Sequence, residues 1–258
     1  MAARAGACHD GPVSTLGVHA PATVRPVTRV GVGAVSSVVI SIGTALGIVA
    51  VALAMLLTPL YLHAAHDAAG SADWLGYTRA ETLAISDRTV GELVFGPASF
   101  AIAAPDGTPF YQASEAAHLR DARAVLYGFV ALAVITAAFA VFAVRRAPHD
   151  MGAWRAVARG GGLLAASLSV VGLLFALTFD VMFELFHRIF FPGGNWSFDP
   201  GTQRLVQLYP IPFWQITVGS LAVLAIGGGA VVWWLARRRA RAVATAPAAA
   251  AVGSPGTR

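Results

Sequence analysis

Four apolar stretches in this chain are long enough to cross a lipid bilayer, and they constrain its fold more than any other feature of the sequence. They span about 32–58, 124–144, 160–179 and 213–235. Each approaches or exceeds the roughly 20 residues that the hydrocarbon core requires of a helix. Only 12% of the residues are charged, whereas a soluble domain has about a quarter. The sequence therefore predicts an all-α membrane protein with four transmembrane helices.

The arginines predict which ends of these helices share a side of the membrane. All 18 basic residues are arginine, and 12 of them lie in the N-terminal tail, in residues 145–159 or in the C-terminal tail, together with two of the 13 acidic residues. The other segments hold six arginines and 11 acidic residues. By the positive-inside rule, both termini are expected to be cytoplasmic. These flanks account for the net charge of +5, and we expect no nucleic-acid partner.

The predicted spans divide the rest of the chain into segments of different character. The tails are rich in small residues without any period, which predicts disorder. The first outer segment is long enough for a small cap, and the second is short and aromatic. The expected order is 1–29 disordered cytoplasmic tail, 30–60 first span, 61–122 extracytoplasmic cap, 123–144 second span, 145–159 cytoplasmic loop, 160–189 third span and outer extension, 190–212 aromatic outer loop, 213–236 fourth span and 237–258 disordered cytoplasmic tail.

Local signals predict a small α/β cap. Thr78 and Glu81 have the spacing of a capping box, so a helix is expected to begin there, and "VGELVF" (90–95) predicts a second short helix. Residues 99–112 alternate weakly around a Pro-Asp-Gly-Thr-Pro turn, which favours a loose hairpin. Ser114 is expected to cap the helix that continues into the second span.

Two Glu-x-x-His segments lie at the outer ends of the second and third spans. Residues three apart share one face of a helix, and an Asp extends each face. The members are Glu115, His118 and Asp121 in the first segment, and Asp180, Glu184 and His187 in the second. The predicted topology brings both histidines to one depth, at the outer membrane surface.

Three interpretations of this pair remain open. Histidine titrates near neutral pH, so one ring could take a proton and the other give one, with Glu115 and Glu184 orienting them. Alternatively, His118, His187 and a carboxylate could hold zinc in a metal-dependent hydrolase. A di-iron site would need a further Glu from each of the other two spans, and neither span contains an acidic residue. Finally, the histidines could anchor a non-catalytic lipid- or partner-binding protein at the interface.

Covalent catalysis through a protein nucleophile is disfavoured. The sequence contains no Gly-x-Ser-x-Gly, and the single cysteine, Cys8, lies in the N-terminal tail, where it permits no intrachain disulfide. A further His-x-x-His-Asp segment, with His63 and His66, ends the first span. No partner for it is evident, and we expect it to be structural.

Around His118 and His187, the sequence resembles the lipoprotein intramolecular transacylase (Lit) family of bacterial four-span membrane proteins. The resemblance extends over about residues 33–235. The family's first motif is Glu, two residues, His-Met-x-Asp-Val and a basic residue. "EAAHLRDAR" is similar to it, with Arg123 as the basic residue and with Leu119 and Ala122 in place of Met and Val. The second motif is Phe-His-x-x-Phe-Phe followed by Gly, Trp, Phe and Asp. "FHRIFFPGGNWSFDP" matches it with Phe186, His187, Phe190, Phe191, Trp196, Phe198 and Asp199.

The resemblance implies a membrane acyltransferase of the bacterial cell membrane, with its active site at the extracytoplasmic face and no cofactor or metal. His118 and His187 would be catalytic, and Glu115, Asp121, Arg123 and Glu184 would support them. The residues of the second motif other than His187 would bind substrate. The implied reaction moves the sn-2 acyl chain of a diacylglyceryl-cysteine lipoprotein to its N-terminal amine. Such lipoproteins and membrane lipid would be the partners.

Overall fold

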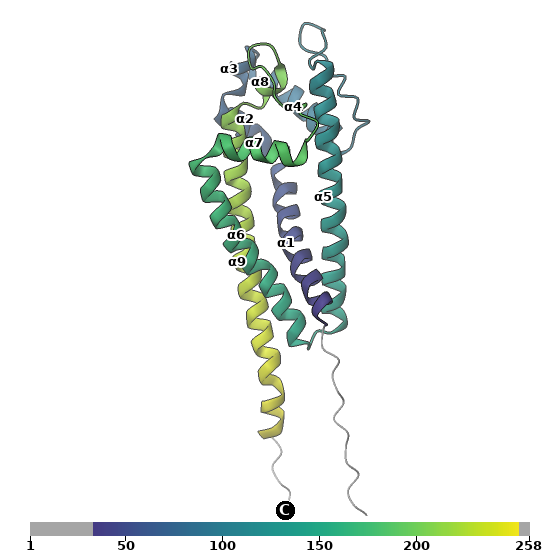
Figure 1. The fold of residues 1–258 in the computed structure, drawn as a ribbon, viewed down its shortest axis with the longest axis vertical. Coiled ribbons are helices and arrows are strands. Elements are labelled where there is room, and N and C mark those ends of the chain that lie inside the picture. The colour runs from purple at the N-terminus through teal and green to yellow at the C-terminus, as the bar shows by residue number, and fades with distance from the viewer. Residues whose placement is uncertain (1–32, 253–258) are drawn as a thin grey trace, which may run out of the picture. The chain divides into compact units, whose positions relative to one another are not determined.

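The computed structural model describes residues 33–252, and helices make up most of that part of the chain (Figure 1). The helices are α1 (Ala34–Leu56), α2 (Pro59–Ala69), α3 (Ser71–Leu75), α4 (Arg79–Val94), α5 (Ala113–Arg146), α6 (Met151–Leu177), α7 (Phe179–Phe190), α8 (Arg204–Leu208) and α9 (Ile211–Val252). The predicted tail 1–29 and the last six residues of the predicted tail 237–258 lie outside the described residues.

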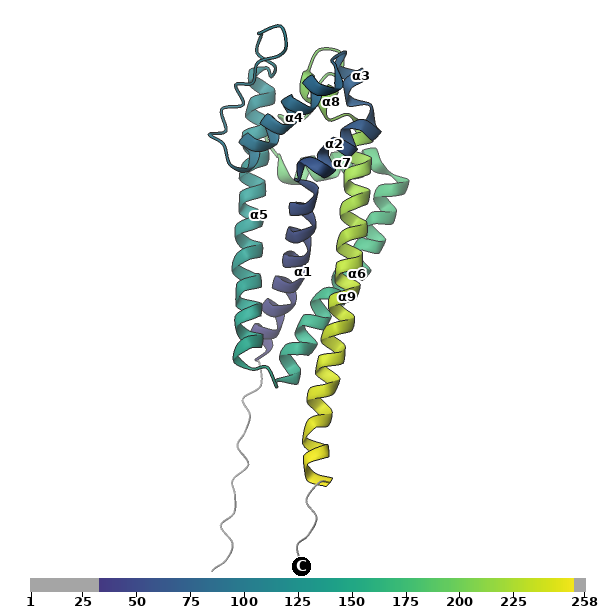
Figure 2. The same ribbon diagram turned by 180° about the vertical axis from the view of Figure 1, so that it is seen from behind.

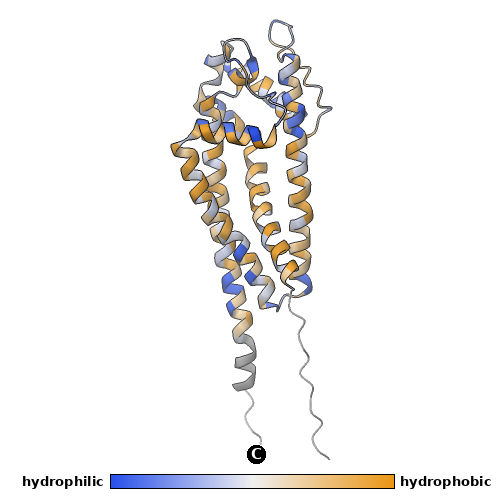
Figure 3. Cartoon of the chain, viewed as in Figure 1, coloured by the Kyte–Doolittle hydropathy of each residue, from blue (hydrophilic) through white to orange (hydrophobic). Residues whose placement is uncertain are grey.

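Four helices, α1, α5, α6 and α9, are long and apolar enough to cross a membrane, which confirms the predicted four-span architecture. Figure 3 shows hydrophobic residues along these helices and hydrophilic residues in the cap and at the opposite ends. α6 packs along α9, and α1 packs against both α5 and α6 (Figures 1 and 2). The chain is therefore a multi-pass membrane protein.

Glycines allow the spanning helices to approach closely. A side chain at Gly43 of α1 would collide with the backbone carbonyl of Thr136 on α5, and one at Gly160 of α6 would collide with that of Ser41 on α1. Gly161 and Gly229 face each other where α6 crosses α9. Small residues at such crossings are how helices pack in lipid, where no hydrophobic effect drives them together.

Two of the spanning helices extend beyond their apolar stretches. α5 has 34 residues, or about 51 Å at 1.5 Å per residue, whereas the hydrocarbon core is about 30 Å thick. Its apolar stretch, 124–144, begins after Arg123, so the preceding three turns project into the cap. α9 continues to Val252, beyond the predicted end of the fourth span at residue 236. Arginine and alanine dominate that extension, and both are strong helix formers.

The cap is helical, which corrects the expected α/β cap. It consists of α2, α3, α4, α8 and the irregular segment 95–112. Within the described residues no strand forms, and residues 99–112 make only an isolated bridge between Ala103 and Pro109. Phe100 and Phe110 turn inward into the cap core, so this segment is held by burial of its side chains rather than by a ladder.

Helix boundaries in and beside the cap differ from expectation in three places. The predicted capping box of Thr78 and Glu81 is confirmed, but α4 then runs unbroken through the predicted second helix. α5 begins at Ala113 and is capped by Gln112 instead of Ser114, because Glu115 completes a capping box with Gln112. The third span ends at Leu177, and α7 is a separate helix after Thr178. α7 crosses the cap end of the bundle instead of continuing α6 (Figures 1 and 2).

Gly43→Ala should destabilise the bundle, because its methyl group would collide with the α5 backbone; overpacking of this kind costs about 1–3 kcal/mol. Gly128→Ala, on α5, is the matched control, since a Cβ there meets nothing within 4 Å. We expect thermal unfolding in detergent to show a clearly lower midpoint for the first variant alone. Equal midpoints would contradict the close approach of α1 and α5 at this glycine.

Candidate functional site

α7 brings the two predicted histidines together. His187 lies on α7, His118 lies on the second turn of α5, and both are buried. Their ring centroids are 6.0 Å apart and the rings are inclined by 27°. This arrangement depends on the break at Thr178, because it lets α7 turn across the end of the bundle toward α5.

Both histidines line a cavity of about 280 Å³ between the cap and the ends of α1, α5 and α9 that adjoin it. Leucines of α1 and α5, including Leu53 and Leu126, form its membrane side. Aromatic and polar side chains form the rest of its wall. They include Phe183, Trp196, Phe198, Tyr209, Phe213, Trp214, Thr89 and Thr217. The cavity is thus apolar, with a small number of polar groups, as is usual for a small-molecule site.

Aromatic rings hold the two imidazoles in place. His118 packs against Phe191 and Phe198, with ring centroids 4.7 and 5.5 Å away. His187 packs against Phe183 at 4.2 Å and Trp196 at 5.1 Å. Three of these four rings come from the second family motif or the loop that follows it.

A hydrogen bond fixes the tautomer of His187. Its Nδ1 lies 2.8 Å from the backbone carbonyl of Phe183. A carbonyl can only accept, so a neutral His187 carries its proton on Nδ1. The lone pair is then on Nε2, where it can accept a proton.

Two buried polar atoms at the cavity have no hydrogen-bond partner among residues 33–252: Nδ1 of His118 and Oγ1 of Thr217. An unsatisfied buried polar group costs about 1–3 kcal/mol, so each needs a partner. A guest with polar atoms near these two positions would recover that cost. Thr217 lies within the fourth predicted span. A threonine in a helix often bonds to a backbone carbonyl of the same helix, and nothing in the sequence indicates that Thr217 does not.

Burial keeps both rings neutral. Burial, and then the neighbouring His187, lowers the pKa of His118 to about 4. Burial also lowers the pKa of His187, against the opposing effect of the Phe183 carbonyl. Both residues lie outside the apolar spanning stretches. At neutral pH the site therefore holds two uncharged imidazoles, which are available as bases.

The two motif glutamates have different environments. Glu115 is fully buried, and its carboxylate accepts one hydrogen bond from the backbone N–H of Gln112 and one from that of Leu205, both at 2.7 Å. Glu184 is exposed and pairs with Arg188 on the same helix. One interpretation of the sequence had both carboxylates orienting the histidines. In the described structure, neither carboxylate bonds to a histidine. The first ties the start of α5 to α8, and the second belongs to the surface of α7.

The remaining predicted supporting residues organise the backbone around the site. Asp121 accepts a hydrogen bond of 2.6 Å from the Asn195 side chain, which fastens the aromatic loop beside His118. Arg123 donates to the carbonyls of Glu92 and Gly96, at the end of α4. Asn195 is a residue that sequence reasoning missed; a polar side chain in the Gly-rich turn was its only signal.

The residues expected to bind substrate divide into three groups. Trp196 and Phe198 line the cavity, and Phe191 is buried against His118. Phe186 and Phe190 are exposed on α7. Asp199 is exposed and accepts hydrogen bonds from Gly201 and Thr202, so it shapes the turn after Phe198.

The second histidine pair, His63 and His66, holds the cap together. His66 is buried between the hydroxyls of Ser71 and Ser86, at 2.9 and 2.7 Å. His63 pairs with Asp87 on α4. These contacts join α2 to α3 and α4, as expected of a structural role.

A metal centre finds little support in the donor geometry. Across residues 33–252, no three side chains of His, Cys, Asp or Glu come close enough together to hold a metal ion. Asp121, the acidic residue on the His118 face, is engaged with Asn195.

These features define a multi-pass membrane protein with a histidine-lined pocket where its cap meets the bilayer. The chain belongs to the lipoprotein intramolecular transacylase Lit family, whose profile matches residues 38–214. Its fold is similar to a solved structure of the membrane integral lipoprotein intramolecular transacylase Lit from Bacillus cereus, with a TM-score of 0.69 and 20% identity over 80% of this chain and 95% of that chain. Two variants of that protein, with one histidine replaced by arginine or by alanine, give TM-scores of 0.65 and 0.64 at 19% identity. They cover 82% and 80% of this chain and 93% of theirs. No curated protein sequence matches the chain.

Glu115→Gln should destabilise the protein far more than Glu184→Gln. The first change replaces one of two carboxylate oxygens that accept buried backbone N–H groups, and hydrogen bonds to charged groups are worth about 1.5–3 kcal/mol each. The second removes an exposed pair on one helix, worth about 0.3–0.5 kcal/mol. Thermal unfolding of both variants in detergent measures the difference. Equal losses would contradict the clamp between α5 and α8.

Proposed function

We propose that this protein is an intramolecular transacylase. In this proposal it moves the sn-2 acyl chain of a diacylglyceryl-cysteine lipoprotein to the N-terminal amine of that lipoprotein and leaves a lyso-form product. The observation that carries the proposal is the pair of neutral, buried imidazoles 6.0 Å apart in one apolar cavity at the membrane boundary. Membership of the Lit family supports the same reaction class.

The cavity suits a substrate that has a polar part outside the bilayer and acyl chains within it. The polar lipoprotein N-terminus would enter under the cap, and the acyl chains would stay in the bilayer beside the leucines of α1 and α5. The amine must reach an ester of its own lipid, which requires the substrate to fold back on itself. Phe183, Trp196, Phe198 and Trp214 form walls that favour this folded conformation. Such orientation is worth several kcal/mol.

A single proton, which leaves the amine and ends on the glyceryl oxygen, is sufficient for both proton transfers of the reaction. Both rings are neutral, so neither starts the reaction as an acid. One imidazole takes a proton as the amine nitrogen attacks the sn-2 carbonyl carbon. When the bond between that carbon and the glyceryl oxygen breaks, the proton returns to the leaving oxygen, either directly or through the second ring. The products are an amide and a glyceryl hydroxyl, and no acyl-enzyme forms.

The polar atoms that the protein leaves without hydrogen bonds in the cavity fit this chemistry. Nδ1 of His118 and the hydroxyl of Thr217 both lack a hydrogen-bond partner within the described part of the chain. We assign Thr217 as a hydrogen-bond donor to a substrate oxygen, which would stabilise charge on the carbonyl as the amine attacks. The positive-inside distribution of arginine supports an extracytoplasmic position for this site, with both termini in the cytoplasm.

His118→Ala and His187→Ala should each reduce transacylation at least about 100-fold, the usual contribution of a general acid–base residue. The measurement is mass spectrometry of the N-terminal lipopeptide of a reporter lipoprotein, from cells with and without the protein. Transfer moves one acyl mass from glyceryl to nitrogen at constant total mass. His149→Ala, in the exposed α5–α6 connection, is the control and should remain active. An unchanged lipopeptide with well-expressed wild-type protein would favour a non-catalytic lipid- or partner-binding role.

The pH dependence tests the neutrality of the two rings. A substrate α-amine titrates near pH 8, so the rate should fall tenfold per pH unit below that value. Because burial lowers the pKa of His118 to about 4 and also lowers the pKa of His187, this slope of one continues without steepening near pH 6.5. Single-turnover rates in detergent between pH 5 and 8 provide the measurement. A slope that steepens toward two near pH 6.5 would show an ordinary histidine pKa and contradict the neutral pair.

A further inference from the structure

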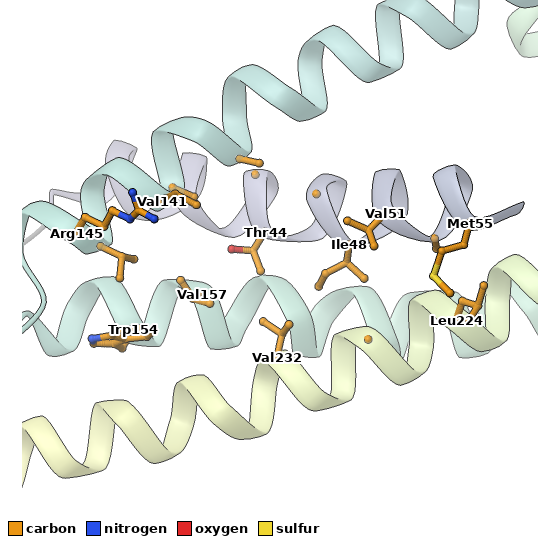
Figure 4. A pocket seen from close by; sticks show the side chains of 17 residues that line it. Thr44, Ile48, Val51, Met55, Val141, Arg145, Trp154, Val157, Leu224 and Val232 are labelled. Atoms are coloured by element: carbon orange, nitrogen blue, oxygen red, sulfur yellow. The ribbon is translucent and has the colours of Figure 1, made fainter. Parts of the chain in front are cut away.

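A second cavity lies among the spanning helices, and none of its lining residues line the histidine cavity. It is a groove of about 690 Å³ between α1, α5, α6 and α9. Figure 4 shows side chains from these helices pointing into one shared space, with Arg145 and Trp154 at the same end. The groove exists because glycines, among them Gly47 and Gly228, place no side chains there.

The groove runs along much of α1. Along α1 its lining runs from Gly43 to Met55, which is about 18 Å at 1.5 Å per residue. The hydrocarbon core is about 30 Å thick, so this is a little over half of it. One end of the groove lies beside the α5–α6 connection, where Arg145 and Trp154 line it, and the other reaches Met55 in the last turn of α1.

The lining is apolar except at the end beside the α5–α6 connection. The Thr44 hydroxyl and the Trp154 indole N–H are already bonded to backbone carbonyls. In the described part of the chain, the exposed Arg145 guanidinium makes no hydrogen bond or ion pair. A groove with an apolar body and one cation at its mouth is complementary to an anionic amphiphile. Arginine binds phosphate through paired hydrogen bonds, and tryptophan favours the headgroup level.

We propose that this groove binds one anionic phospholipid from the leaflet on the side of the α5–α6 connection. One acyl chain lies along α1 between α5 and α9, and the phosphate contacts Arg145. Such a chain would connect the α1–α5 pair to the α6–α9 pair. The lipid therefore stabilises the bundle, and the site is separate from the transacylase cavity and does not depend on that activity.

Native mass spectrometry of the purified full chain tests the site. The chain is delipidated in detergent and then incubated with dioleoylphosphatidylglycerol or with zwitterionic dioleoylphosphatidylcholine. We expect one retained phosphatidylglycerol per chain and little phosphatidylcholine. Arg145→Gln should reduce retention roughly fivefold, because one basic residue near a membrane surface contributes about 1 kcal/mol to anionic-lipid binding. Arg146→Gln is the matched control, since Arg146 lies over the Phe142 ring and outside the lining.

A second pair of variants tests the groove rather than the charge. Val141→Trp fills the groove, whereas Ile135→Trp places the same side chain on an exposed part of α5 outside it. Added phosphatidylglycerol should raise the unfolding midpoint of wild type and of Ile135→Trp, but not that of Val141→Trp. Equal retention of the two lipids, equal losses from the two arginine variants, or unchanged retention in Val141→Trp would each overturn the proposal.

Discussion

The histidine site depends on one buried carboxylate. Glu115 sits where the first turn of α5 meets the first residues of α8, and it accepts a backbone N–H from each. The chain between His187 and α8 must close over the cavity, because it carries Phe191, Trp196 and Phe198. With its start fixed by α7 and its end fixed at Leu205, this segment has little freedom. Asp121 and Asn195 then fasten its middle to the face of α5 that carries His118.

The same enclosure determines the chemistry of the site. A loop that excludes water lowers the pKa of both imidazoles and keeps them neutral. Solvent-exposed rings would be partly protonated near pH 6.5, and the fraction able to accept a proton would fall. In the proposed reaction, which has a competing hydrolysis, the aromatic cover would thus exclude water and also maintain the base. Both effects follow from the packing of Phe183, Phe191, Phe198 and Trp196 around the two rings.

The sequence was sufficient for the features that depend on short-range pattern. Apolar length predicted four spans, and the Glu-x-x-His spacing together with the topology predicted that His118 and His187 would meet. The partners of the glutamates could not be predicted, because a buried partner depends on which distant backbone arrives. The backbone of Leu205 reaches Glu115, whereas Glu184 pairs, among the described residues, only with Arg188 on its own helix. The role of Thr217 could not be predicted for the same reason, because its unpaired hydroxyl follows from the packing of α9 against the cavity. The expected strands were absent because residues 99–112 gain more by burying aromatic rings in the cap core than by pairing backbone.

The last turns of α1 contribute side chains to both cavities, so the position of this part of the helix affects both. Leu53, Leu56 and Leu57 face the histidine cavity, whereas Val51 and Met55 face the groove. These residues belong to the last two turns of α1, so a shift of the helix changes both spaces together. Close glycine contacts with α5 and α6 hold the lower part of α1, which leaves its upper turns as the part that can adjust. An acyl chain in the groove would limit that adjustment, and the positions of Leu53 and Leu57 in the wall of the histidine cavity would then depend on lipid as well as on protein.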